Sequence, residues 1–219
     1  MCFSAPASFI AASGLSVVGV ISTQQARTRK IIPFALIPFF FALQQACEGF
    51  VWLTVNNNNI YNQISIYAYL FFASIWWPFW IPFSLCITEE NNKRKTILLI
   101  LLIMGLILAS CYLLSWLLFP QTALVINHHM AYPLLSTPFM SASLEIIYLE
   151  KSMAILYLLA TVLPLFVSSV KNLWLAGIII IILCIIARLY FAAVFGSLWC
   201  FFAAIASLLI CLIVRTYKK

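Results

Sequence analysis

The sequence contains no aspartate, and it has only five glutamates and two histidines in 219 residues. The absence of aspartate excludes intramembrane aspartyl proteases and hydrolases that depend on an aspartate. The chain also lacks an HExxH zinc signature, a GxSxG nucleophile elbow and a glycine loop that could cradle phosphate. The last apolar stretch has no lysine before its end, which excludes a retinal Schiff base. The sequence therefore indicates no known reaction.

Charged residues are also scarce: they make up 8% of the chain, and hydrophobic residues make up 65%. Soluble domains have about 25% charged and roughly 45–50% apolar residues. A helix needs about 20 apolar residues to cross a membrane. We count seven such stretches: residues 3–22, 32–55, 65–88, 96–119, 152–170, 173–194 and 196–214. They predict an all-α membrane protein, a bundle of seven transmembrane helices that forms one domain over residues 1–219.

The basic residues predict an orientation. Ten of the twelve fall on one side of the expected bundle, and Lys151 and Arg188 are the exceptions. The positive-inside rule then places the N-terminus outside and the C-terminus in the cytoplasm of a bacterial inner membrane. We expect the first stretch to be retained, because it lacks the basic region of a signal peptide. The net charge of +7 is explained by this bias and by membrane lipids as partners, and it requires no nucleic acid.

The one long polar connection, residues 120–151, is expected outside the membrane. Three prolines in its first half predict an extended or turned chain. From Ser141 the apolar spacing becomes helical and continues into the fifth stretch. This segment is expected to cover the outer end of the bundle as a lid.

The stretch LQQACEGFVWL, residues 43–53, places polar groups inside a transmembrane helix. Gln44, Glu48 and Trp52 are spaced by one turn, and Gln45 lies three residues before Glu48. Glu48 lies about 10 Å below the outer helix end at 1.5 Å per residue. An ionisable group at that depth faces the bundle interior and marks a functional site by default. The alternative is a protonated or hydrogen-bonded carboxyl group that serves helix packing.

Arg188 is the only basic residue expected at the depth of Glu48. A buried arginine without a carboxylate is unfavourable in a membrane. Depth and elimination therefore pair Arg188 with Glu48. The alternative is that Arg188 extends along its apolar stem to the outer head groups.

Other candidate residues are expected near the same depth. His128, His129 and Tyr132 lie on the external segment, where one histidine would face inward or both would be solvated. Trp77 belongs to an aromatic run around Pro78 and Pro82, which should kink the third helix and give it a cavity wall, unless the run serves packing alone. Trp199 begins the last helix.

Seven cysteines do not form a disulfide pattern. Five are scattered through apolar helices, where cysteine acts as a small hydrophobic residue. Cys2 and Cys200 differ, because the predicted topology places both near the outer face. They could bridge, or they could share a metal with His128, His129 or Glu48.

Several of these motifs together resemble an uncharacterised bacterial family of small polytopic membrane proteins. The motifs are MCFSAPASF at the start, which fits MCFSxxASF, QQACEGFVW in the second helix, which fits QQxxEGxxW, WWPFWIP in the third helix, and WCFFAA in the last. The resemblance spans the chain. It implies motif positions for the following residues and no mechanism: Cys2, Ser4, Gln45, Glu48, Trp52, Trp77, Trp199 and Cys200.

The sequence leaves two functional hypotheses. The first is a receptor-like or transport-associated protein that binds a small ligand in an outward-facing pocket. Glu48 would be the charged centre, Gln44 and Gln45 would orient the ligand, and Trp52 and Trp77 would form walls. The second is a membrane enzyme or redox protein that uses Cys2, Cys200, a histidine and Glu48 as metal ligands or thiols. The identity of a cofactor or ligand does not follow from the sequence.

Overall fold

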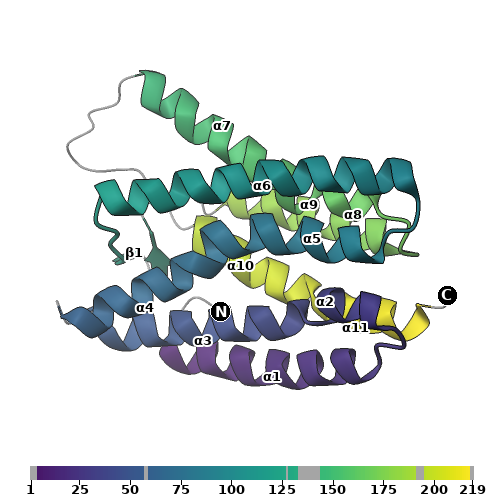
Figure 1. The fold of residues 1–219 in the computed structure, drawn as a ribbon. Helices are drawn as coiled ribbons and strands as arrows, with labels where there is room; N and C mark the ends of the chain where they lie inside the picture. Colours follow the sequence, from purple (N-terminus) through teal and green to yellow (C-terminus); the bar gives the residue numbers. More distant parts are fainter. Residues whose placement is uncertain (1–3, 57–58, 127, 133–143, 191–194, 218–219) are drawn as a thin grey trace.

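The computed structural model describes residues 4–56, 59–126, 128–132, 144–190 and 195–217. Its helices lie side by side in a bundle, and a small β-hairpin lies at one end (Figure 1). The elements in chain order are α1 (Ala5–Gln24), η1 (Arg29–Ile31), α2 (Ile32–Ala35), α3 (Ile37–Thr54), α4 (Ile60–Leu70), η2 (Phe71–Trp76), α5 (Trp77–Thr88), α6 (Asn92–Leu118), β1 (Leu124–Ile126), β2 (His129–Ala131), α7 (Leu144–Thr161), α8 (Leu163–Val167), α9 (Leu173–Tyr190), α10 (Phe195–Ala206) and α11 (Leu208–Thr216).

Six helical segments of the described chain are long and apolar enough to cross a membrane: Ala5–Gln24, Arg29–Thr54, Ile60–Thr88, Asn92–Leu118, Leu173–Tyr190 and Leu198–Thr216. They correspond to six of the seven stretches expected from the sequence. The remaining stretch, expected over 152–170, is a shorter apolar helical region, Ser152–Val167, which is interrupted between α7 and α8. The described chain is therefore mostly helical, with six helices whose length and composition are compatible with a membrane protein. The seventh span and the orientation stay predictions.

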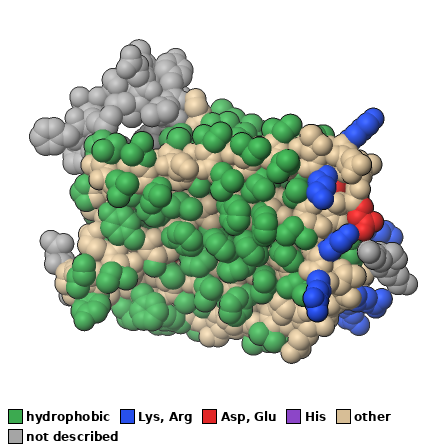
Figure 2. All heavy atoms as spheres, viewed as in Figure 1, with side chains coloured by type: hydrophobic (Ala, Val, Ile, Leu, Met, Phe, Trp, Pro, Cys, Tyr) green, Lys and Arg blue, Asp and Glu red, His purple; other side chains and the backbone are tan. Residues whose placement is uncertain are grey.

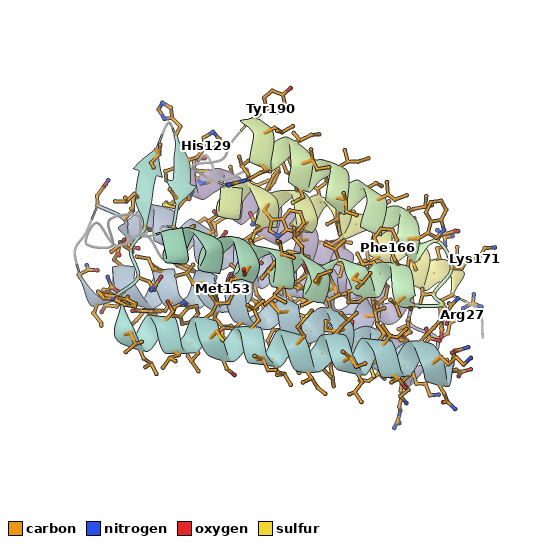
Figure 3. All side chains as sticks on the ribbon, turned by 90° about the horizontal axis from the view of Figure 1, so that it is seen from above. Arg27, His129, Met153, Phe166, Lys171 and Tyr190 are labelled. Carbon is orange, nitrogen blue, oxygen red and sulfur yellow. The ribbon has the colours of Figure 1, made fainter. Side chains whose placement is uncertain are left out.

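Charge is distributed unevenly over the molecule. Hydrophobic side chains cover the face shown in Figure 2, and the Lys and Arg side chains visible there gather at one end. Arg27 and Lys171 lie at that end, and His129 lies at the opposite end, near the last residue of α9 (Figure 3). An apolar body with one basic end is the arrangement that the positive-inside rule produces.

Residues 120–151, which the sequence predicts to be external, have the expected local structure where they are described. β1 and β2 pair antiparallel, with Val125 opposite Met130. His128 takes the turn with a positive φ of 61°. α7 begins at Leu144 and runs as one helix to Thr161, so the predicted continuation into the fifth stretch is confirmed.

Prolines divide the third helix, as the sequence predicts. The chain forms a π-helical segment, η2, directly before Pro78. In a π-helix the carbonyl of Ala73 would accept from the amide of residue 78, and proline has no N–H. The hydroxyl of Tyr157 on α7 donates to the Ala73 carbonyl instead, at 2.7 Å. The irregular segment η2 thereby forms a hydrogen bond with α7, which is distant in the sequence.

Pro82 has a related effect on α6. It removes the helical donor for the carbonyl of Pro78, and Gly105 of α6 packs directly against that oxygen. A Cβ atom at position 105 would overlap the Pro78 carbonyl. The close approach of α5 and α6 therefore requires glycine at this position.

α3 belongs to the most buried of the long apolar segments in the described chain. Of its membrane-spanning window, 56% of the residues are buried, against 28% for α1. α1 packs along α3 over its whole length: Gly19 lies against Phe39, and Gly49 lies against the ring of Phe9. The apolar part of the buried face of α3 includes Ile37, Phe41 and Ala42.

Glu89 links two connections at the basic end. The Ser169 N–H and hydroxyl each donate to its carboxylate at 2.7 Å, and the Asn91 N–H donates at 3.0 Å. Burial alone would raise the pKa of Glu89, but these hydrogen bonds and the charge of Arg94 lower it below its ordinary value. The next residue, Glu90, forms an exposed ion pair with Lys30 at 3.4 Å.

We expect Glu89→Gln to lower the free energy of unfolding by about 1–3 kcal/mol, because a buried charged acceptor of three hydrogen bonds is lost. Since the folded pKa is depressed, this stabilisation is present above the ordinary carboxyl pKa of about 4.3 and disappears as pH falls through the folded value. Unfolding in detergent micelles between neutral and acidic pH measures both effects. Glu90→Gln is the matched control and should change stability by no more than about 1 kcal/mol. Equal losses for the two variants would contradict the assigned role of Glu89.

We expect Gly105→Ala to destabilise the bundle by about 1–3 kcal/mol, because the added methyl group meets backbone that cannot rotate away. Gly14→Ala provides the control, since a Cβ atom there meets nothing within 4 Å. That substitution should be neutral or stabilise by up to about 1 kcal/mol. Thermal unfolding of both variants in one detergent tests the contact, and a neutral Gly105→Ala would show that α5 and α6 lie further apart.

Candidate functional site

Three polar residues of α3 are completely buried. The side chains of Gln44, Gln45 and Glu48 are each 0% exposed. Glu48 lies six residues before Thr54, the last residue of α3, which is about 9 Å along the helix. Polar groups at such depth face the protein interior because lipid offers them no hydrogen bonds. The predicted inward orientation of this group is what the structure shows.

Gln44 is held by a residue of α5. The indole N–H of Trp77 donates to Gln44 Oε1 at 2.6 Å, and the Trp77 ring stacks on Phe41 with ring centres 3.9 Å apart. Trp77 is the first residue of α5, directly before Pro78, so the kink of the third helix positions this donor. The amide oxygen of Gln44 is therefore satisfied.

Gln45 is not satisfied in the same way. Neither Oε1 nor Nε2 of Gln45 has a hydrogen-bond partner among the described residues, and Gln44 Nε2 also lacks one. Ser8 of α1 is fully buried as well, and its hydroxyl is unpaired. The contact of Gly49 with Phe9 places Ser8 at about the level of Glu48. Each buried polar atom left without a partner costs about 1–3 kcal/mol.

Cys200 brings the last helix to this group. It is 3% exposed and a free thiol, and it lies beside Tyr69 and Gln44, close enough to Glu48 to sense its charge. Tyr69 in turn stacks on Tyr132, with ring centres 4.4 Å apart and planes at 17°. The segment 120–151, which the sequence predicts to be external, thereby reaches the buried group through two stacked tyrosines. We call Gln44, Gln45, Glu48, Tyr69 and Cys200 the polar cluster.

An apolar cavity of about 60 Å³ adjoins the polar cluster. Trp77 and Cys200, which both line the cavity, also contact Gln44. Tyr157 and Trp199 line the cavity beside them. The predicted cavity wall at Trp77 is thus present, although the cavity itself is lined almost wholly by carbon.

The other predicted site residues divide into two groups. Trp52, Tyr132 and Trp199 belong to one buried apolar cluster together with Tyr69 and Cys200. Trp52 is half-buried, and its indole N–H has no partner among the described residues. The structure therefore brings distant parts of the sequence to one region of the bundle.

Arg188 belongs to the second group. Its side chain is exposed on α9, whereas Glu48 is fully buried. This difference in burial does not by itself favour the predicted pairing of Arg188 with Glu48, which stays a prediction.

The two histidines differ in environment. His128 is exposed at the hairpin turn, and His129 is half-buried. Burial, and then the charge of His128, lowers the pKa of His129. Cys2 lies outside the described residues. In the part of the chain that the structure describes, no three His, Cys, Asp or Glu side chains are grouped as metal ligands.

Comparison with family models identifies the family of this chain. A family model described as a family of unknown function, DUF6629, covers residues 1–219. The chain belongs to the DUF6629 family. This confirms membership of an uncharacterised family over the whole chain. No curated protein and no solved structure matches it.

Two tyrosines of this DUF6629 chain were not predicted from the sequence. Tyr69 contacts Cys200 and Tyr132, and Tyr157 lines the cavity and donates to Ala73. Both lie in apolar helices, where tyrosine is a common core residue. The one available signal was that a buried hydroxyl in a membrane requires a partner.

Gln44 and Gln45 give a matched pair for testing this geometry in the DUF6629 protein. Gln45→Leu should raise the stability of the ligand-free protein by about 1–2 kcal/mol, because it removes unpaired buried polar atoms. Gln44→Leu should lower stability by about 1–3 kcal/mol, because the indole N–H of Trp77 loses its acceptor. Thermal unfolding in detergent compares the two. A Gln45→Leu variant as unstable as Gln44→Leu would show that the Gln45 amide is paired after all.

Proposed function

We propose that this DUF6629 protein binds a small hydrogen-bonding molecule at the polar cluster. It would do so as a multi-pass protein of the bacterial inner membrane, with its N-terminus outside and a cluster that opens outward. The observation that carries the proposal is the Gln45 amide, which is fully buried and has neither of its atoms paired within the described chain. Gln44 is one residue away from Gln45, and it is paired with Trp77. The fold thus supplies a partner where packing requires one.

The free groups define what the ligand must offer. Gln45 presents one acceptor and two donors, and the Gln44 amide nitrogen adds further donors. The carboxyl group of Glu48 lies in the same cluster and disfavours an anion while it is ionised. The ligand therefore carries both a donor and an acceptor, and it is uncharged or positively charged.

The position of the cluster favours a binding role over a channel. The cluster lies toward the end of α3 that is opposite the basic end, and the other half of the buried α3 face is apolar, with Ile37, Phe41 and Ala42. A through-path for a polar solute would require polar groups along that half as well. A receptor-like or transport-associated role fits this distribution.

One observation supports the second candidate function, thiol or metal chemistry. Cys200 is a free cysteine that contacts Tyr69 and Gln44, within electrostatic range of Glu48. Metal analysis of purified protein and of Cys200→Ser decides between the two functions. Metal present in the wild type and absent from the variant would favour the enzyme or redox role.

The ligand itself is tested by mass spectrometry of the protein in nanodiscs. We expect the wild type to carry a bound small molecule, and Gln45→Leu to carry it with at least about tenfold lower occupancy, which corresponds to 1.4 kcal/mol. Ala154→Leu, an exposed substitution on α7, should bind like the wild type. Equal occupancy in wild type and Gln45→Leu, or ordered water alone at the site, would contradict the proposal.

A further inference from the structure

Four parts of the chain meet at the basic end, around Glu89 and Glu90 of the connection between α5 and α6. Ser169, in the connection between α8 and α9, donates to the Glu89 carboxylate from its N–H and from its hydroxyl, each at 2.7 Å. The Lys30 ammonium group of η1 lies 3.4 Å from Glu90 Oε1. Tyr217, directly after α11, lies close enough to Lys30 and both glutamates to sense their charges. Segments that are far apart in the sequence are thus adjacent at this end.

These segments carry far more positive than negative charge. Glu89 is 3% exposed and already accepts three hydrogen bonds, and Glu90 is paired with Lys30. The first turn of α6 contains no acidic residue. Figure 2 shows the visible Lys and Arg side chains gathered at this end, and Arg27 and Lys171 are labelled there in Figure 3. We call the exposed cations of these segments the basic surface: three in residues 27–30, three in residues 93–95, Lys171 and Arg215.

The basic surface borders directly on exposed apolar side chains. Ile32, Ile97 and Trp174 each follow the cations of their segment by two or three residues, and they are 38%, 45% and 50% exposed. They lie near the starts of three segments that are long and apolar enough to cross a membrane. A nucleic acid or an acidic soluble protein would use only the charge of such a surface. A phospholipid would use both its charge and the apolar side chains next to it.

We propose that the basic surface binds an anionic phospholipid with two phosphate groups, of the cardiolipin class. One phosphate lies at the cations of residues 27–30 and the other at those of residues 93–95, and acyl chains lie along Ile32 and Ile97. Clustered Lys and Arg side chains at the ends of membrane helices attract anionic head groups. A molecule that carries both phosphates has a further advantage, because its second contact forms at a high effective concentration.

This surface lies toward the end of the bundle opposite the polar cluster. The inference therefore goes beyond the proposed function and does not depend on it.

Native mass spectrometry of the full-length protein in detergent tests the proposal with three lipids: cardiolipin, phosphatidylglycerol and phosphatidylcholine. We expect the wild type to bind cardiolipin at least about tenfold more tightly than phosphatidylcholine, which has no net charge. Phosphatidylglycerol, with one phosphate, should bind more weakly than cardiolipin. Equal affinity for cardiolipin and phosphatidylcholine would overturn the proposal, and equal affinity for cardiolipin and phosphatidylglycerol would overturn the assignment of two phosphates.

A double variant, Arg29→Gln with Lys93→Gln, removes one cation from each of two segments. It should lower the affinity for cardiolipin at least about tenfold. Both side chains are exposed, so the variant should unfold at the temperature of the wild type. If it does not fold, Lys93→Gln alone gives the same test with an expected loss of about fivefold. Unchanged cardiolipin binding in the folded variant would overturn the proposal.

The matched control, Arg29→Lys with Lys93→Arg, retains both charges and should bind cardiolipin like the wild type. Inorganic pyrophosphate carries two phosphates without acyl chains, and at equal concentration it should not displace the lipid. A short RNA should not displace it either. Displacement by pyrophosphate would show that the surface recognises phosphate alone, and displacement by RNA would make the partner a nucleic acid. Either result would overturn a lipid as the occupant.

Discussion

Hydrocarbon provides no hydrogen bonds, so every polar group at membrane depth must find its partner within the protein. This constraint determines the position of α3. Its polar residues Gln44, Gln45 and Glu48 are fully buried, and the helix itself is the most buried of the long apolar segments among the described residues. α1 packs against it through Gly19 and Gly49, and α10 reaches it through Cys200. Neighbouring helices thus bury the helix that carries these three polar side chains.

The same constraint explains how the kinked helix is held. Prolines at positions 78 and 82 remove the helical donors for the carbonyls of Ala73 and Pro78. Neighbouring helices pack against both carbonyls: Tyr157 of α7 donates to Ala73 O, and Gly105 lets the backbone of α6 lie close to Pro78 O. These contacts fix the start of α5, which is where Trp77 meets Gln44. The two prolines, by removing backbone donors, thus contribute to the position of Trp77 beside Gln44.

Sequence reasoning could predict the elements whose signal is compositional. Long apolar runs predicted six of the spans. The spacing of Gln44 and Glu48 predicted that they share one buried face, and the prolines predicted an irregular helix near Pro78. It missed the break before Leu163, although Pro164 favours a new helix start there. The pairing of Arg188 with Glu48 stays a prediction, because depth along a helix says nothing about direction around it. α9 is apolar on all sides, so its periodicity could not show that Arg188 is exposed. Tyr69 carried only the general signal that a buried hydroxyl requires a partner.

Gln45 is informative because it departs from the rule that polar groups at membrane depth find partners within the protein. One residue away, Gln44 has a partner supplied by a helix that two prolines have positioned, so the fold can satisfy an amide at this depth. An apolar side chain at position 45 would avoid the unfavourable burial of two unpaired atoms. A protein that retains an amide there gives up stability that a substitution could restore, a trade-off found at sites where function opposes stability. A small apolar cavity begins one contact away, at Trp77 and Cys200, so the unpaired amide groups lie next to space that the fold leaves unfilled.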